Sequence, residues 1–379
     1  MPVIPKLVLD TFCEVEDLLR PWAYEKFWDL DEHTIVPGAV YLIGRQQFET
    51  HTARIQELIA QDTCHVILSN PAEGSETLLG AIQRYGVDTL ARKHQLLLIG
   101  GGDMDAAYAC LQYDSFLPKI LDYEENLGEI DHALAIFSKT HKPYKFLFLN
   151  GRMRANRKYL LEYLRLSDML DHGLWTSLDQ APGPSRNIKL GHNGQDLMSV
   201  VRPVQYLDQY YEVPRYRERL IANAQNHFVK YDLFGGEWGD IYLYAPPYVD
   251  SYFSIVTETV FLYPHSFRTE KIWKPIAMGH PWICAANAGY YRDLRNLGFR
   301  TFDGIIDESF DSIENNQQRI ERIAQIIQDL CRSDLVSFLK AAEPVCKYNQ
   351  QHLALMRQKV RAEFPERFFQ FLRQHQWMT

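Results

Sequence analysis

Short apolar runs separated by polar turns recur through the first third of the chain. Strands are predicted at residues 6–10, 39–43, 65–68 and 95–99. Between them, residues 49–60 and 75–85 carry apolar side chains at the three- and four-residue spacing of helices. Strands that alternate with helices predict a parallel sheet covered by helices on both faces, so we expect an α/β domain here.

The same alternation resumes after residue 140. The run KFLFLN at residues 145–150 predicts a buried strand, and residues 155–170 have helical spacing. Long helices are predicted at the end of the chain, interrupted at Pro344 and Pro365. We therefore expect two Rossmann-like domains. The boundaries we predict are an N-terminal domain at 1–140, a C-terminal domain at 141–345 and a helical extension at 346–379 that packs back across the domains.

The pattern at residues 253–283 predicts a strand, a loop, a helix and a second strand. Thr269 suits the N-cap of the helix, because its hydroxyl accepts a hydrogen bond from a backbone N–H that has no partner within the helix. Glu270 complements the positive end of the helix dipole. Gly279 suits a left-handed residue after the helix, and Pro281 opens the next strand.

A helix N-terminus at the carboxyl ends of parallel strands is suited to bind an anion. Here Lys271 would neutralise phosphate, and the carboxylate of Glu270 would accept hydrogen bonds from ribose hydroxyls. The alternative is that both side chains belong to an ordinary solvated helix start.

This stretch resembles the donor-binding segment of the alpha-1,3-fucosyltransferases, a family of glycosyltransferases with two Rossmann-like domains facing a cleft, the GT-B arrangement. In that family a Phe-Glu-Asn-Ser element precedes Tyr-x-Thr-Glu-Lys, a helix, a glycine and a Pro-Val-Val strand. The matching elements here, in the same order and spacing, are Val256-Thr257-Glu258-Thr259, Phe267-Arg268-Thr269-Glu270-Lys271, Gly279 and Pro281-Trp282-Ile283. The departures around Glu258 and at Phe267 leave the sugar open.

Arginines crowd the predicted helix start after residue 150. Arg152, Arg154 and Arg157 follow Asn150, although basic side chains oppose the dipole at a helix N-terminus. A bound diphosphate would reconcile them, since guanidinium groups pair with phosphate oxygens in a bidentate manner. The resemblance implies donor-phosphate roles for Asn150 and Arg157, and Arg154 is a neighbouring candidate for the same diphosphate. The alternative is that the arginines pair with acidic residues of the preceding connection.

The catalytic base is predicted less directly. Gly100-Gly101-Gly102-Asp103 follows a predicted strand, where three glycines allow either close approach to a ligand or a sharp turn. Asp103 at that strand end is our candidate base, with Glu124 and Glu125 as alternatives; it also suits a helix N-cap. Asp103-Met104-Asp105 has the form of a metal-binding D-x-D but follows a strand of the other domain, so no metal cofactor is expected, and Mg²⁺ is not required.

Composition narrows the class of protein. The 379 residues carry a net charge of −8, which argues against a nucleic-acid partner. The six cysteines show no metal-binding spacing, as in proteins of reducing compartments. No apolar run approaches the roughly 18–20 residues of a membrane span. We expect a cytoplasmic protein without a membrane span.

The resemblance implies an inverting glycosyltransferase that moves a sugar from a nucleotide sugar, GDP-fucose or a related GDP-sugar, to a glycan or other hydroxyl acceptor. Arg157 and Lys271 would stabilise the leaving diphosphate. Glu258 would contact the sugar or serve in catalysis, and Thr269 and Glu270 would help to bind the donor. The alternatives are a non-catalytic scaffold that retains the fold and a nucleotide-sugar epimerase.

Overall fold

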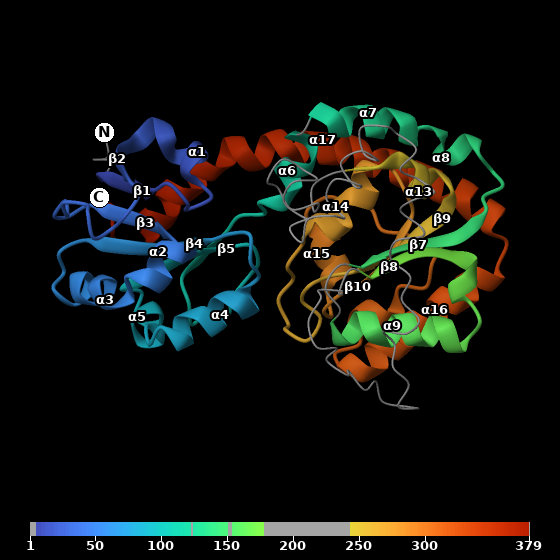
Figure 1. Cartoon of the computed structure of the whole chain (residues 1–379), viewed down its shortest axis with the longest axis horizontal. Coiled ribbons are helices and arrows are strands. Elements are labelled where there is room, and N and C mark those ends of the chain that lie inside the picture. The colour runs from blue at the N-terminus through green and yellow to red at the C-terminus, as the bar shows by residue number, and fades with distance from the viewer. Residues whose placement is uncertain (1–4, 123, 151–153, 178–242, 379) are drawn as a thin grey trace, which may run out of the picture. The chain divides into compact units, whose positions relative to one another are not determined.

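The computed structural model describes residues 5–122, 124–150, 154–177 and 243–378 (Figure 1). These residues form two compact α/β units, each built on a parallel sheet, as the alternation of strands and helices predicts. The first unit comprises Met1–Pro118, His265–Arg268 and Met356–Thr379. The second comprises Lys119–Pro264 and Thr269–Leu355.

The first unit contains a six-stranded parallel sheet of order β2-β1-β3-β4-β5-β6. Its strands are β1 (Leu7–Asp10), β2 (Ala23–Phe27), β3 (Val40–Gly44), β4 (His65–Asn70), β5 (Leu96–Gly100) and β6 (Cys110–Gln112). Its helices are α1 (Glu16–Leu19), the 3₁₀ turn η1 (Arg20–Trp22), α2 (Arg45–Thr50), α3 (Thr52–Ala60), α4 (Ser75–Arg84) and α5 (Asp88–Arg92). Helix α6 (Phe116–Asp122) begins in this unit and leads into the second.

Each face of this sheet has its own apolar core. On one face the strands pack against α2, α3, α4 and α5 (Figure 1). On the other, Leu9 and Leu42 pack with Phe364, Phe368 and Leu372 of the long helix α17 (Leu335–Gln374). The sheet of the first unit is therefore covered on one side by the last residues of the chain.

The second unit contains a four-stranded parallel sheet of order β10-β9-β7-β8. Its strands are β7 (Tyr144–Asn150), β8 (Gly173–Ser177), β9 (Ser251–Thr257) and β10 (Trp282–Ala285). Its helices and 3₁₀ turns are α7 (Glu124–Ala133), α8 (Ala135–Ser138), α9 (Ala155–Leu166), η2 (Leu170–His172), α13 (Ala245–Val249), α14 (Glu270–Ala277), α15 (Tyr290–Asn296), η4 (Ser309–Ser312) and α16 (Asn316–Arg332), followed by the first part of α17.

The two central strands of this sheet, β7 and β9, carry the candidate site at their carboxyl ends. Every residue of β9 is buried, including Ser251, Ser254 and Thr257, as in a parallel strand that is covered on both faces. Helices α9 and α16 pack together on one face of the sheet, and α13, with α7 and α8 beside it, lies on the other (Figure 1). The carboxyl ends of β7 and β9 meet at one edge of the sheet.

Two predicted boundaries differ from the structure. The units divide at Pro118 rather than near residue 140, because α7 and α8 pack with α13 of the second unit. The second unit ends at Leu355 rather than at 345, because the first part of α17 belongs to it. Residues 335–374 form one helix, and neither Pro344 nor Pro365 interrupts it. A proline removes one backbone hydrogen bond, and the apolar residues that flank Pro365 are held in the core of the first unit.

Three strands were not predicted. β2 is an exposed, polar edge strand, β6 has only three residues, and β8 is the short sequence GLWTS. Among the described helices, none combines the length and apolarity that a membrane crossing requires.

Candidate functional site

The candidate site begins where β7 and β9 end side by side. Asn150 is the last residue of β7 and Thr257 the last of β9, and both are buried. The hydroxyl of Thr257 donates a hydrogen bond to Asn150 Oδ1 over 3.2 Å. The parallel pairing of β7 with β9 thus brings together the two stretches that carry most of the candidate residues.

Helix α9 adds its first turn to this edge. The guanidinium of Arg157, only 3% exposed, donates from Nη2 to the carbonyl oxygen of Thr257 at 3.2 Å. Asn156 Nδ2 donates to the carbonyl oxygen of Glu258 at 3.4 Å. Arg154 occupies the N-cap position of α9 with an exposed side chain. Arg152 lies outside the described residues.

Glu258 is fully buried and serves as a connector. Its Oε1 accepts hydrogen bonds from the backbone N–H of Thr269 (3.0 Å) and from the hydroxyl of Tyr290 (2.9 Å). Its Oε2 accepts from the Thr269 hydroxyl (2.6 Å) and the Thr259 N–H (3.2 Å). Burial raises the pKa of Glu258, and Lys271 and Thr269 oppose that effect. This carboxyl group thereby joins the end of β9 to the start of α14.

The start of α14 has the predicted capping geometry. Thr269 is the N-cap residue, and its hydroxyl oxygen accepts a hydrogen bond from the backbone N–H of Lys271 at 3.3 Å, which confirms the N-cap prediction. Gly279 follows the helix with a left-handed φ of 64°, as predicted.

Lys271 and Glu270 form an ion pair at this helix start. The ammonium also donates to the Thr269 hydroxyl at 3.2 Å, and 22% of the lysine side chain is exposed. Burial opposes the charge of Glu270, but Lys271 and Lys274 hold the pKa of its carboxyl below the usual value. An anion that binds Lys271 therefore competes with, or joins, an existing carboxylate.

Asp103 belongs to the first unit, whereas the other candidate residues belong to the second. Its side chain is exposed. With the Gln112 amide oriented as its neighbours require, that amide donates to Asp103 Oδ1 (2.8 Å) and accepts from Arg268 Nη2 (2.7 Å). Arg268 is buried and pairs with Asp114 at 2.9 Å. Because no helix follows Asp103, it is not the N-cap that its position suggested.

The triple glycine before Asp103 accommodates the chain itself. A Cβ on Gly101 would lie 2.4 Å from the Phe267 ring, and one on Gly102 would lie 2.7 Å from the Ser266 carbonyl oxygen. Gly102 and Phe267 form an antiparallel bridge. These glycines therefore allow the segment His265–Arg268 to pack against the end of β5.

A group of metal-ligating residue types lies elsewhere in the first unit. His51 faces Asp29 through Nε2 (3.3 Å) and Asp31 through Nδ1 (3.2 Å), and Arg54 also pairs with Asp31 at 3.0 Å. Both ring nitrogens of His51 face carboxylate oxygens, and the ion pair of Arg54 with Asp31 belongs to the same polar network. These residues belong to the first unit and are not part of the candidate site. The expectation that the chemistry needs no metal stays a prediction.

Two members of the site were not predicted from the sequence, and two predicted candidates lie outside the described side chains. Tyr290 and Asn156, which bind the side chain and the backbone of Glu258, carry no motif that would have selected them. The side chains of Glu124 and Glu125, the alternative bases, lie outside the described part of the structure.

Comparison with protein-family models, curated proteins and solved structures finds no match to this chain.

Proposed function

We propose that this protein is a glycosyltransferase of the GT-B type that transfers a sugar from a nucleoside-diphosphate sugar to a hydroxyl acceptor. One observation supports this most: Asn150, Arg157, Glu258 and the start of α14 with Lys271 are joined by hydrogen bonds at the carboxyl edge of one parallel sheet. Such edges are where open α/β sheets bind nucleotides. The presence of two parallel-sheet units also agrees with a two-domain enzyme.

The chemistry we propose is an inverting displacement. A base removes the proton of the acceptor hydroxyl, whose oxygen attacks the anomeric carbon as the bond to the nucleoside diphosphate breaks. Negative charge then accumulates on the departing diphosphate, where nearby cations lower the barrier. Because side-chain cations can supply this charge, the proposal includes no metal, and the local resemblance favours a GDP-linked sugar.

Roles are assigned by exposure. Lys271 and Arg154 reach solvent and are assigned to the diphosphate, while Arg157 adds its positive charge from a buried position. Asn150 and Thr269 hold the edge of the donor site, and Glu270 is assigned to the ribose. Glu258 positions α14, since four donors already occupy its oxygens. Asp103, an exposed carboxylate, is assigned as the base.

Ligand-induced stabilisation tests this proposal. The full chain is melted with GDP, UDP, CDP and TDP, with and without Mg²⁺. A nucleotide at a hundred times its dissociation constant adds about 2.7 kcal/mol to the free energy of unfolding. We expect one nucleotide to act without Mg²⁺, and Lys271→Gln and Arg154→Gln to reduce its effect. Lys340→Gln, an exposed lysine on α17 in the same unit, is the control for loss of a charge.

The outcomes separate the alternatives. Stabilisation by one nucleotide, together with release of that nucleoside diphosphate from its sugar only when a hydroxyl acceptor is present, supports the transferase. Conversion of the sugar without an acceptor identifies an epimerase. A chain that no nucleoside diphosphate stabilises is instead a scaffold that retains this fold.

A further inference from the structure

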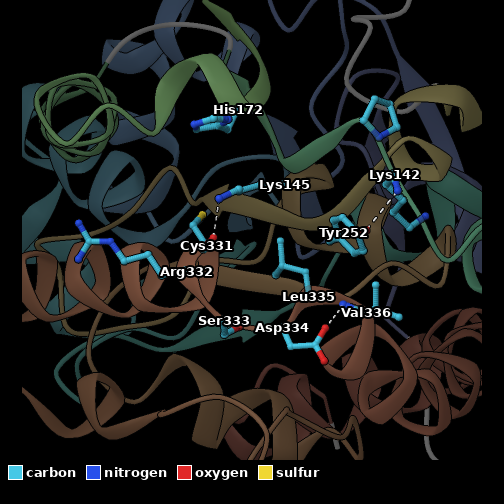
Figure 2. Close-up of a pocket in the computed structure, with 11 residues that line it drawn as sticks. Lys142, Lys145, His172, Tyr252, Cys331, Arg332, Ser333, Asp334, Leu335 and Val336 are labelled. Atoms are coloured by element: carbon cyan, nitrogen blue, oxygen red, sulfur yellow. Dashed lines mark hydrogen bonds between the residues drawn. The ribbon is translucent and has the colours of Figure 1, made fainter.

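A cavity of about 390 Å³ opens at the opposite, amino-terminal edge of the second sheet (Figure 2). Lys145 is the second residue of β7, Tyr252 is the second residue of β9, and His172 immediately precedes β8. The end of α16 and the start of α17, residues 331–336, complete the wall. The strands are parallel, so this cavity lies at the other end of the sheet from Asn150 and Thr257.

Basic side chains dominate the lining. Lys142, Lys145, His172 and Arg332 face a single acid, Asp334. The Asp334 carboxylate is already engaged in capping α17. Its Oδ1 accepts from the N–H groups of Val336 (3.1 Å) and Ser337 (3.3 Å), and its Oδ2 accepts from the Ser337 hydroxyl (2.6 Å). The ammonium of Lys142 is engaged as well, because its Nζ donates to the carbonyl oxygen of Val249 at 2.5 Å. The positive charges of Lys145 and Arg332 are therefore left for a ligand.

The basic groups keep donors for a ligand. Lys145 Nζ donates one hydrogen bond, to the carbonyl oxygen of Cys331 at 2.8 Å, and an ammonium has three donors. The side chains of Arg332 and His172 are exposed, and within the described ranges neither side chain forms a hydrogen bond or an ion pair, although the backbone N–H of His172 donates to the carbonyl oxygen of Met169. In the view of Figure 2, His172, Lys145 and Arg332 surround one side of the cavity, and Lys142 and Tyr252 stand at the other.

We propose that this cavity is a second ligand site, which binds the phosphate group of a small phosphomonoester. Two unmatched positive charges suit a phosphate dianion, and the guanidinium of Arg332 offers paired donors in the geometry that phosphate oxygens accept. The volume falls in the range of small-molecule pockets, so the cavity holds a phosphate together with part of the molecule that carries it. The site is separate from the proposed donor site and does not depend on it.

Calorimetric titration of the full chain tests the second site. The probes are inorganic phosphate and glucose 6-phosphate in a chloride buffer of low ionic strength. We expect both to bind, the ester more tightly, and Arg332→Gln to raise the dissociation constants about tenfold, as loss of a charge-assisted hydrogen bond predicts. Lys145→Gln should weaken binding as well. Lys340→Gln, an exposed lysine further along α17, should leave the dissociation constants unchanged.

Competition distinguishes this site from the donor site. Phosphate affinity that survives Lys271→Gln and saturation with a nucleoside diphosphate supports a separate site. Phosphate binding that Lys271→Gln removes, or that is unchanged in both Arg332→Gln and Lys145→Gln, overturns the proposal. So does a wild-type chain that binds neither probe. Melting temperatures of the variants establish that each is folded before titration.

Discussion

Arg157 Nη2 lies 3.2 Å from the carbonyl oxygen of Thr257, a residue 100 positions further along the chain. This contact attaches the first turn of α9 to the last residue of β9. It also holds a positive charge, almost fully buried, at the edge of the sheet where a donor diphosphate is proposed to bind. The same guanidinium can thus stabilise the fold through its hydrogen bond and supply positive charge to the proposed donor site.

Replacement of Arg157 should therefore affect stability first. Arg157→Gln is expected to lower the free energy of unfolding by about 1.5–3 kcal/mol, because a buried hydrogen bond to a charged donor is lost. Arg154→Gln, at the exposed N-cap position of the same helix, should change it by less than about 0.5 kcal/mol. Urea denaturation of both variants measures the difference, and equal midpoints would refute the structural role of Arg157.

Glu258 is expected to be intolerant of its amide analogue. Glu258→Gln keeps the shape of the side chain, but it replaces an acceptor with a donor opposite either the Thr259 N–H or the Thr269 N–H, depending on how the amide is turned. A loss of about 1–3 kcal/mol in the free energy of unfolding follows from a buried group left without its partner. Glu314→Gln, an exposed glutamate in the same unit, is the matched control. If the two variants have the same melting temperature, Glu258 does not hold α14 in place.

His280 should make the protein sensitive to mild acid. Its ring is buried between the Ser254 hydroxyl (2.9 Å from Nδ1) and the Ser251 carbonyl oxygen (2.9 Å from Nε2), and burial lowers its pKa to about 3. Between that value and the unfolded pKa of about 6.5, only the unfolded state binds the proton. Stability therefore falls as the pH falls through this window, by about 2 kcal/mol from pH 7 to pH 5.

The measurement compares wild type with His280→Gln, which has no proton to bind in this range. The free energy of unfolding of each is determined at pH 7, 6 and 5. The variant should be less stable at pH 7, where its hydrogen bonds are impaired, yet lose less on acidification. Identical pH slopes for the two proteins would exclude His280 as the source.

Two glycines should respond to alanine with opposite signs. Gly101→Ala places a methyl group 2.4 Å from both the Phe267 ring and the Pro71 carbonyl oxygen, so we expect a loss of about 1–3 kcal/mol. Gly80 lies within α4 with nothing inside 4 Å of the added carbon, and Gly80→Ala should gain about 0.5–1 kcal/mol. The melting temperatures of the two variants, each compared with that of the wild type, test both predictions. Stabilisation by Gly101→Ala would contradict the close approach of Phe267.

The last part of α17 should be essential to the first unit. Phe368 is fully buried against its sheet, and Phe368→Ala is expected to cost about 3–5 kcal/mol. Leu355→Ala, on the same helix at a position 67% exposed, should cost little. Guanidinium denaturation followed by circular dichroism compares them, and a mild effect of Phe368→Ala would show that this helix is dispensable there.

Local patterns predicted the elements that contain an apolar run or are marked by caps. All residues of β9 and β10 are buried, and β7 is buried at Phe146–Phe148 and Asn150 although Leu149 is exposed. Thr269 begins α14 through a hydroxyl group that binds the backbone of its own neighbour. These features depend on a few consecutive residues, so the sequence carries them directly. The convergence of Asn150 and Arg157 with the second stretch was foreseen only through the resemblance, and the pairing of β7 with β9 brings the stretches together.

The remaining features depend on partners distant in sequence. β2 exposes polar side chains at the sheet edge, so its sequence has no apolar run to reveal it. Pro344 and Pro365 predicted breaks in α17 by local rules, but the helix continues through both. Around Pro365, contacts with residues 7–42 and 97–113 hold the helix in the core of the first unit. The occupation of Glu258 by Tyr290 and Thr269 likewise arises from tertiary packing alone.

The cover that α17 provides over the first sheet has a consequence for synthesis on the ribosome. Residues 7–113 emerge early, yet Leu9, Leu42 and their neighbours meet Phe364, Phe368 and Leu372 only after the whole second unit has been translated. In an N-terminal domain that folds while the rest is still being made, the whole core would be available at that stage. Here one apolar face of the first sheet can be covered only once residues 364–372 have been translated.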